Sequence, residues 1–284
     1  MPELPEVETV VRATRDRLVG RRIVGFESCW PRQVSPDAAS LTAAVVGRRV
    51  DALSRRGKFI AMRLHDGGFV LIHLRMSGRL AWDDGGPAVA HLRAVFSLDD
   101  GSRLLFCDAR KFGRIIYTAD YDSFSAKLGA EPLDRGFTPA RLGALLTSRA
   151  RRIKPLLLDQ SVVAGLGNIY TDESLFRAGI HPLRRSDSLS KVELRRLHTA
   201  IRAVLRDGVR RNGASIDWVY PGGSMQEMFR VYGRAGQPCD VCGTPILALR
   251  VGGRGTHICP RCQPRRRPAS AAPRRRVSKR TCSR

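Results

Sequence analysis

Two pairs of cysteines near the C-terminal end constrain the fold more than any other feature of the sequence. The pairs are Cys239-x2-Cys242 and Cys259-x2-Cys262, and sixteen residues separate them. Two short turns at this spacing bring four thiolates together in the tetrahedral arrangement that Zn²⁺ prefers. We therefore predict one zinc ion in a small hairpin over about residues 236–263. Because four protein ligands leave no open coordination position, this zinc is expected to be structural.

The other cysteines favour a metal site over a disulfide framework. The chain has seven cysteines, an odd number, and Cys29, Cys107 and Cys282 stand apart from the two pairs. In a reducing compartment, closely spaced cysteines of this kind bind metal rather than form disulfides. The alternative, two pairs of ordinary cysteines, does not account for the zinc-site spacing. No chemical role is expected for the three isolated thiols.

The charge of the chain predicts a polyanionic partner. The 284 residues include 50 Lys and Arg against 26 Asp and Glu, which gives a formal net charge of +24. Such an excess steers nucleic acid or an anionic membrane toward the surface and disfavours a neutral small-metabolite enzyme. No apolar run approaches the ~20 residues of a membrane helix, and the acidic N-terminal segment lacks the apolar core of a secretory signal. We expect a cytoplasmic, nucleoid-associated protein without membrane contact.

Hydrophobic patterning predicts β structure between helical segments, an α+β fold. Residues 5–19 place apolar side chains three and four positions apart, as in an amphipathic helix. From residue 22 to 118, short runs rich in Val, Ile, Leu and Phe alternate with turn signals, which is typical of an antiparallel sandwich or barrel. After about residue 130 the period is helical, and Ser190 and Glu193 have capping-box spacing.

These patterns divide the chain into four parts. Residues 1–130 form the predicted N-terminal β-sandwich domain, 131–230 a helical domain and 231–264 the zinc finger. The last part, residues 265–284, is rich in Arg and Lys and contains no acidic residue. A cationic segment of this composition cannot bury a core, so we expect a disordered tail.

The first residues carry a possible nucleophile. Proline after an initiator methionine favours removal of Met1, which would leave Pro2 with a free secondary amine. An α-amino group titrates near pH ~8, about two units below lysine, so more of it is nucleophilic at neutral pH. Glu3 lies beside it and Glu6 follows one helical turn later. The alternative role of both glutamates is to complement the dipole of the first helix.

Six segments together resemble a known family. They are MPELPEVETV, RRGKF, HLRMSG, DARKFGR, LLLDQSVVAGLGNIYTDESLF and VYGRAGQPCDVCG with GRGTHICPRCQ. In this order, from residue 1 to about 263, they resemble the bacterial formamidopyrimidine-DNA glycosylase family, the sister of the endonuclease VIII branch. The resemblance implies a β-sandwich with an N-terminal helix, then a helix-two-turns-helix domain and a zinc-finger hairpin, with DNA bound in between.

The resemblance also implies the activity. Such a protein is a bifunctional DNA glycosylase and AP lyase of base excision repair, which removes 8-oxoguanine and formamidopyrimidines from double-stranded DNA and also cleaves at abasic sites. It would act as a monomer with one zinc ion and no organic cofactor.

Catalytic roles follow from the resemblance residue by residue. Pro2 would attack C1′ of the damaged nucleotide, expel the base and hold the sugar as a Schiff base, which makes β- and δ-elimination of the phosphates feasible. Glu3 would protonate the sugar ring oxygen, and Glu6 would support the site. Lys58 would contact phosphate and donate a proton. Arg254 would clamp the phosphates that flank the lesion.

Five further residues are expected to bind DNA. Asn168 lies in a turn where its amide and nearby N–H groups could hold phosphate, and His91 is assigned to DNA contact by resemblance. Met76, Arg110 and Phe112 match the side chains that refill the stack once the damaged base has left it. The alternatives are core packing for Met76 and a strand face for Phe112. Because these residues come from two separate segments, they favour the oxidised-purine branch.

Two rival functions remain open at this point. One is the oxidised-pyrimidine branch, which shares the chemistry. The other is a zinc-ribbon DNA-binding protein without catalysis, against which Pro2, Glu3 and Lys58 argue. Arg75 stands where the family commonly has glycine, and the loop at 216–229, expected to close over the everted base, does not identify the lesion.

Overall fold

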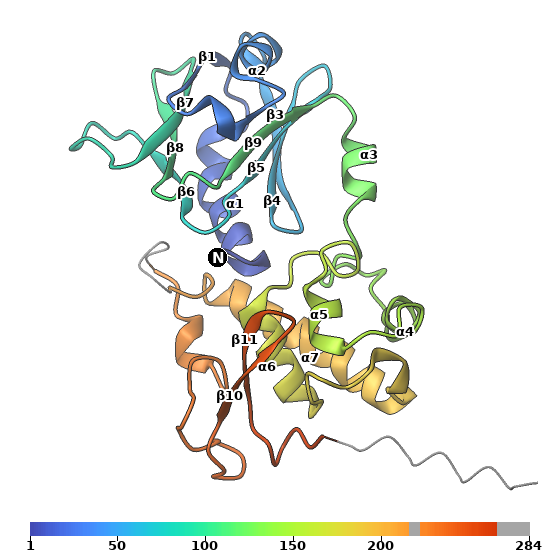
Figure 1. Cartoon of the computed structure of the whole chain (residues 1–284). Helices are drawn as coiled ribbons and strands as arrows, with labels where there is room; N and C mark the ends of the chain where they lie inside the picture. The colour runs from blue at the N-terminus through green and yellow to red at the C-terminus, as the bar shows by residue number, and fades with distance from the viewer. Residues whose placement is uncertain (216–221, 266–284) are drawn as a thin grey trace, which may run out of the picture.

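The structure of the chain is a computed structural model that describes residues 1–215 and 222–265 (Figure 1). Strands β1–β9 lie together in one half of the molecule, and helices α4–α7 lie with β10 and β11 in the other (Figure 1). The predicted tail from residue 266 onward and the first part of the loop 216–229 lie outside the described residues. The four predicted domain boundaries stay a prediction.

Helix α1 (Leu4–Leu18) opens the fold where the apolar spacing predicts a helix. Pro5 lies in its first turn, where a missing N–H group costs no helical hydrogen bond. Val7 and Val11 are buried in the core of the β half, whereas Leu4 is buried in the core of the helical half. The first turn of α1 therefore lies at the junction of the two halves.

The β half consists of two sheets. Phe96 and Phe106 from one sheet and Ile60 and Ile72 from the other share a single buried core, as the alternating apolar pattern predicts. Helix α2 (Ala38–Val45) contributes Leu41 and Val45 to the same core. Across the first sheet the strands are β1 (Ile23–Ser28), β7 (Leu92–Leu98), β8 (Arg103–Asp108) and β6 (Gly78–Trp82); across the second they are β2 (Val34–Ser35), β9 (Arg114–Thr118), β5 (Phe69–His73), β4 (Phe59–Leu64) and β3 (Val50–Arg56).

The predicted antiparallel sandwich is confirmed, with one addition. Strand β2 has only two residues and pairs parallel with β9, whereas the other strand pairs of both sheets, within the part of the chain described, are antiparallel. This short strand directly follows a 3-10 turn, η1 (Pro31–Gln33), and lies at the edge of the second sheet. The sequence offers too few residues there for a strand to be recognised.

The second half is helical. Its core contains Leu142, Leu156, Tyr170 and Leu197, each from a different helix. The capping box predicted from Ser190 and Glu193 is present at the start of the long helix α7. The elements are α3 (Tyr121–Ala126) in the connection, then α4 (Pro139–Thr147), α5 (Ile153–Leu158), α6 (Asn168–Ala178), α7 (Lys191–Arg210) and the 3-10 turns η2 (Ser186–Ser188) and η3 (Met225–Met228).

The predicted hairpin is formed by β10 (Leu247–Val251) and β11 (Arg254–Ile258), which pair antiparallel. Cys239 and Cys259 are buried with Phe176 of α6 in a small separate core. The hairpin thus packs against the helical half through β11 and α6, which are in contact. In the described part of the chain, no helix is long and apolar enough to cross a membrane.

Candidate functional site at the junction of the two halves

The N-terminus lies between the two halves of the molecule (Figure 1). Met1 is exposed, whereas Pro2, Glu3 and Leu4 are buried. While Met1 is attached, the Pro2 nitrogen is part of an amide and is not nucleophilic. Removal of Met1 would turn the same nitrogen into a secondary amine at the junction.

Glu3 joins the two halves through its carboxylate. Its Oε2 accepts a hydrogen bond from the backbone N–H of Gly167 (2.6 Å), and its Oε1 accepts one from Ile169 (2.9 Å). A longer contact runs from the N–H of Tyr170 to Oε2 (3.4 Å). The carboxylate therefore caps the N-terminus of α6, where unpaired N–H groups favour a negative charge. The alternative role for Glu3 is to complement the dipole of its own helix, but the contact is made to a helix whose start lies 164 residues further along the chain.

Two glycines make this contact possible. A Cβ atom on Gly167 would lie 2.3 Å from the carboxyl carbon of Glu3, and one on Gly165 would lie 2.8 Å from Leu4 Cβ. Gly165 also has a φ of +91°, which L side chains rarely adopt. The Gly-Leu-Gly run before Asn168 is therefore required for α1 to approach α6. These glycines can be seen in the sequence, but the sequence alone indicates only a turn there.

The pKa of Glu3 is raised to about 7, chiefly because the side chain is buried. The charge of Lys58 opposes this effect and is the largest influence that lowers the pKa of Glu3. Lys58 lies in the turn between β3 and β4 and is only 5% exposed. Its burial lowers the pKa of its ammonium group, and Glu3 and Glu6 raise it. A carboxyl group that titrates near neutrality beside a buried lysine suits acid–base chemistry.

Glu6 is the second buried carboxylate at this junction. Its Oε2 accepts the N–H of Glu3 (2.8 Å), and its Oε1 accepts the hydroxyl of Tyr170 (2.7 Å) and the N–H of Ala214 (2.8 Å). Burial raises the pKa of Tyr170 well above its usual value, and the adjacent Glu6 carboxylate raises it further, so the phenol stays a hydrogen-bond donor. Glu6 holds the backbone of Glu3 and the start of the loop after α7, which agrees with a supporting position.

Asn168 contacts the zinc hairpin at the residue next to Arg254. Asn168 Nδ2 donates to the carbonyl oxygen of Gly255 (2.9 Å), the residue after Arg254. Arg254 is exposed at the start of β11, and its charge acts on Lys58. Two of the predicted phosphate contacts thus lie on the same side of the junction as the buried carboxyl group of Glu3.

A buried ion pair fixes the hairpin to the helices, and the sequence analysis missed it. Lys154 Nζ donates to Asp172 Oδ1 (2.7 Å), Thr256 Oγ1 (2.8 Å) and the carbonyl oxygen of Gly255 (2.9 Å). Asp172 Oδ2 accepts the N–H of His257 (2.9 Å). Lys154 and Asp172 are almost fully buried, so each requires the other. They come from α5 and α6, and no sequence spacing reveals the pair.

The three predicted stack-filling residues lie on two neighbouring exposed loops. Met76, in the turn between β5 and β6, is 38% exposed, and Phe112, between β8 and β9, is 51% exposed. The guanidinium carbon of Arg110 lies 5.1 Å from the centre of the Phe112 ring. Core packing, the alternative for Met76, is therefore wrong, and so is the strand face for Phe112, which lies between β8 and β9.

Asp108 holds these two loops together and was not singled out by the sequence. Its Oδ1 accepts the Ser77 hydroxyl (2.5 Å) from the Met76 loop and the N–H of Arg110 (3.2 Å). Its Oδ2 accepts the N–H of Gly113 (2.7 Å) and the amide of Gln33 (2.9 Å). Asp108 is 1% exposed. Its own N–H donates to the carbonyl oxygen of His91 (2.9 Å), so this predicted DNA contact is attached to the same cluster.

The four clustered cysteines fit a zinc ion. Their Sγ atoms all lie within 4.8 Å of one another, and three of the separations are 3.4 Å, 3.6 Å and 3.9 Å. A tetrahedron with Zn–S bonds of about 2.3 Å has sulfur–sulfur edges of about 3.8 Å. The predicted single structural zinc is therefore supported by the geometry, and Cys239, Cys242, Cys259 and Cys262 would hold it.

Replacing Cys239 by serine should release the zinc and weaken binding to any DNA duplex by about tenfold or more, because Arg254 sits on the hairpin that the metal stabilises. Metal content by mass spectrometry and DNA affinity by fluorescence anisotropy measure the two effects. Cys29→Ser is the matched control, since Cys29 is an exposed thiol outside the cluster. Full zinc content in Cys239→Ser would contradict the assignment.

Family models match almost the whole chain. Residues 1–115 match the formamidopyrimidine-DNA glycosylase N-terminal domain and residues 128–219 the formamidopyrimidine-DNA glycosylase H2TH domain. Residues 236–265 match the zinc finger found in FPG and IleRS.

Individual proteins agree with the models. The formamidopyrimidine-DNA glycosylase of Symbiobacterium thermophilum is 46% identical over 97% of this chain and 93% of its own length, and that of Geobacillus kaustophilus is 44% identical over 93% and 100%. Two solved structures of Lactococcus lactis FPG, a point mutant with Fapy-dG-containing DNA and the protein with DNA containing an abasic site, are 35% identical to this chain. They cover 93% of this chain and 100% of theirs, with TM-scores of 0.87 and 0.86.

The fold and the site define a DNA-repair glycosylase of the class that joins a β-sandwich, a helix-two-turns-helix domain and a zinc finger. The chain belongs to the formamidopyrimidine-DNA glycosylase family. This membership confirms the resemblance that the six sequence segments carry.

Proposed function

We propose that this protein is a bifunctional DNA glycosylase and AP lyase of base excision repair that removes oxidised purines from double-stranded DNA. The observation that carries the proposal is the buried carboxyl group of Glu3, with a pKa of about 7, directly beside the Pro2 nitrogen and under the influence of Lys58. A carboxyl group that titrates near neutrality beside the N-terminal amine and a buried lysine suits acid–base catalysis, which DNA binding alone does not require.

The chemistry begins once Met1 is removed. The secondary amine of Pro2 attacks C1′ of the damaged nucleotide, and the sugar ring opens as its oxygen takes a proton from Glu3. The base then leaves with the electron pair of its bond to C1′ and with the proton of the Pro2 nitrogen, and the sugar stays on Pro2 as an iminium. The resulting iminium acidifies the adjacent carbon, so that the two phosphates leave in successive β- and δ-eliminations. Lys58 supplies positive charge next to the reacting sugar, and Glu6 holds the Glu3 backbone through the 2.8 Å hydrogen bond.

Duplex DNA is proposed to lie across the junction. Arg254, Asn168 and His91 are proposed to hold phosphates, while the net charge of +24 supplies the sequence-independent attraction. The zinc ion stiffens the hairpin that carries Arg254. The proposed enzyme works as a monomer on lesion-containing or abasic duplexes and, as a repair protein of the genome, at the nucleoid.

The lesion class is inferred from the exposed loops. Met76, Arg110 and Phe112 come from two loops fixed by Asp108, and they are proposed to fill the space vacated by the everted nucleotide. The Arg110 guanidinium offers donors to the acceptor edge of an orphaned cytosine, the usual partner of an oxidised guanine. This arrangement favours 8-oxoguanine and formamidopyrimidines as substrates.

Truncating Phe112 or Met76 to alanine should slow base release from a lesion duplex and leave the melting temperature nearly unchanged, because both side chains are exposed. Phe106→Ala is the matched control: Phe106 is fully buried, so its truncation should cost about 3 to 5 kcal/mol of stability. Thermal melting and single-turnover base release measure both effects. A fall in melting temperature for Phe112→Ala equal to that of Phe106→Ala would remove these residues from the proposed role.

The direct test of the lesion class is base release from three duplexes that carry 8-oxoguanine opposite cytosine, 8-oxoguanine opposite adenine, or thymine glycol. The proposal predicts release from the first and slower release from the other two. Arg110→Ala should reduce the difference between cytosine and adenine as the opposite base. Preferred release of thymine glycol would assign the chain to oxidised pyrimidines instead.

A further inference from the structure

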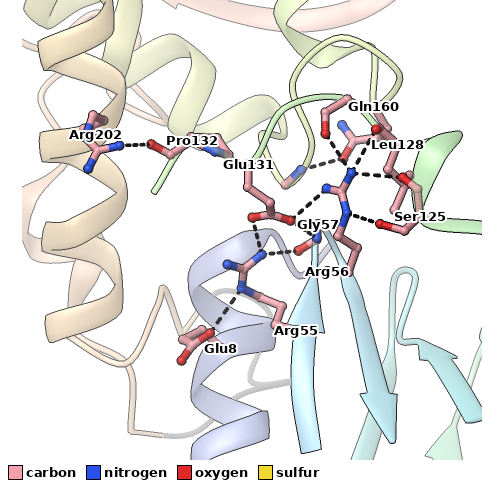
Figure 2. A network of polar contacts seen from close by, with 12 residues as sticks. Glu8, Arg55, Arg56, Gly57, Ser125, Leu128, Glu131, Pro132, Gln160 and Arg202 are labelled. Atoms are coloured by element: carbon pink, nitrogen blue, oxygen red, sulfur yellow. Dashed lines mark hydrogen bonds and ion pairs between the residues drawn. The ribbon is translucent and has the colours of Figure 1, made fainter. Parts of the chain in front are cut away.

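Two arginines of the RRGKF segment have no role in the proposed chemistry. Arg55 and Arg56 end strand β3, immediately before Gly57 and Lys58. Both side chains point toward Glu131, which lies in the connection between the two halves (Figure 2). We call Arg55, Arg56 and Glu131 the junction clamp.

Glu131 is the centre of the junction clamp. Its Oε2 accepts a hydrogen bond from Arg55 Nη1 (2.8 Å), and its Oε1 accepts one from Arg56 Nη1 (3.0 Å) and another from the backbone N–H of Gly57. The Glu131 side chain is 9% exposed, and those of Arg55 and Arg56 are 9% and 14% exposed. At this burial, removal of the carboxylate would leave two guanidinium groups close together without compensation.

Arg56 binds the backbone of the connection at several points (Figure 2). Its Nη2 donates to the carbonyl oxygens of Ser125 (3.0 Å), Leu128 (2.8 Å) and Gly129 (2.9 Å), and its Nε donates to Ser125 Oγ (2.9 Å). These contacts satisfy most of the donors of the guanidinium group. They fix the end of β3 to the segment where the chain passes into the helical half.

Arg55 extends the clamp toward α1. Its Nε donates to Glu8 Oε2 (3.2 Å), and its Nη1 also donates to the carbonyl oxygen of Gly57 (3.1 Å). Glu131 and Arg55 thus hold Gly57 by its N–H and by its carbonyl group. Gly57 is the residue before Lys58, so the clamp determines where the peptide that carries Lys58 lies.

The contacts continue from the connection to the opposite side of the site. The N–H of Gly129 donates to the carbonyl oxygen of Gln160 (2.8 Å), whose Oε1 accepts the N–H of Gly165 (2.9 Å). The carbonyl oxygen of Gly165 in turn accepts the N–H of Leu4 (3.0 Å), the residue after Glu3. A continuous path of hydrogen bonds therefore joins the peptide before Lys58 to the peptide after Glu3.

We propose that the junction clamp is a positioning cluster, in which Glu131 sets the place of Lys58 relative to Glu3 for the base-excision step. The inference rests on the proposed function. A purely structural tie between the two halves would need only contacts between side chains. The Glu131 carboxylate instead accepts the N–H of Gly57, which belongs to the turn that presents Lys58.

The test uses Glu131→Gln, which keeps the size of the side chain and removes its charge. Single-turnover base release from an 8-oxoguanine duplex at saturating enzyme should fall about 10- to 100-fold, since small misplacement of a reacting group has effects of this size. The affinity for the duplex should change by less than about threefold, because Arg254, Asn168 and His91, the proposed phosphate contacts other than Lys58, lie outside the clamp.

The pH dependence separates positioning from a structural role. The charge of Lys58 lowers the pKa of Glu3, so a displaced Lys58 raises that pKa. The pH profile of base release has a limb on its high-pH side, where the rate declines. This limb should therefore move to higher pH in Glu131→Gln. A tie that only stabilises the fold would lower the melting temperature and leave this limb in place.

Glu193→Gln is the matched control. Glu193 forms an equally buried ion pair with Arg184, at the start of α7 and outside the clamp. The Glu193→Gln variant should keep the wild-type rate of base release and the wild-type pH limb, whatever its melting temperature. Loss of base release in wild type and Glu193→Gln alike would count against the proposed function rather than the clamp.

A second variant keeps the test decisive if Glu131→Gln does not fold. Arg55→Lys retains the positive charge but loses the geometry of the guanidinium group, which reaches Glu8 from Nε and both Gly57 and Glu131 from Nη1. It should show the same upward shift of the pH limb and a smaller loss of rate. Rates within twofold of wild type and an unmoved limb in every folded clamp variant would overturn the inference.

Discussion

Glu3→Gln is expected to lower base release from an 8-oxoguanine duplex by about 10²- to 10⁴-fold, the range that a positioned acid–base group contributes. Glutamine keeps the size of the side chain and one acceptor oxygen for the N–H groups of Gly167 or Ile169, so α1 should stay attached to α6. Binding of the lesion duplex should therefore change little. Quenched-flow measurement of base release, together with duplex affinity, separates the two effects.

The pH dependence of the wild type follows from the same group. Burial raises the pKa of Glu3 from 4.5 to about 7. The protonated carboxyl group, present below this pH, is the form that can donate a proton to the sugar oxygen. Base release should therefore decline as the pH rises through about 7, and the residual rate of Glu3→Gln should lack this decline.

A preformed abasic site provides the control for Glu3→Gln. The base is already absent there, and Pro2 is unchanged, so the variant should still form a Schiff base with the aldehyde of the sugar. Loss of Schiff-base formation as well as of base release would mean that Glu3 is needed for the fold of the N-terminus. In that case its proposed role as an acid would be contradicted.

Blocking the Pro2 nitrogen should have the second large effect. A chain that keeps Met1, or that carries a non-cleaved extension before it, has an amide at this position and should give no covalent intermediate. Base release should fall to the background of the assay. Met1 is exposed, so an extension before it can leave the junction intact, and thermal melting alongside the assay checks that the fold is kept.

Two variants control for the blocked N-terminus. The same extension placed after Arg284 leaves Pro2 free and should preserve full activity. Pro2→Gly, which provides a primary amine after Met1 removal, should retain partial lyase activity on abasic DNA. Normal activity in the N-terminally extended chain would show that another amine is the nucleophile.

Features encoded locally could be predicted from the sequence. The spacing of apolar residues placed α1, and the two Cys-x2-Cys pairs placed the metal site, because each depends on residues a few positions apart. Ser190 and Glu193 formed the expected capping box for the same reason. Pro2 was a candidate from its amine alone, whereas Glu3 became one through the family resemblance, since an isolated acidic helix start has a simpler explanation.

Contacts between distant segments could not be predicted. Asp108 holds two loops through Ser77 and Gly113, and Lys154 meets Asp172 from another helix. The spacing of these residues in the sequence predicts neither contact. The approach of Glu3 to Gly167 has a sequence signal, the glycine itself, but its meaning appears only when the Cβ clash with the Glu3 carboxyl carbon is measured.

The central claim, a Schiff base at the N-terminal proline, is tested most directly by borohydride reduction on a duplex with a single abasic site. The enzyme with its native N-terminus is digested after trapping, and the cross-linked peptide is identified by mass spectrometry. The account predicts one adduct per chain, on the peptide that begins with Pro2. An adduct on Lys58 or another lysine, or no adduct with a chain proven to start at Pro2, would contradict it.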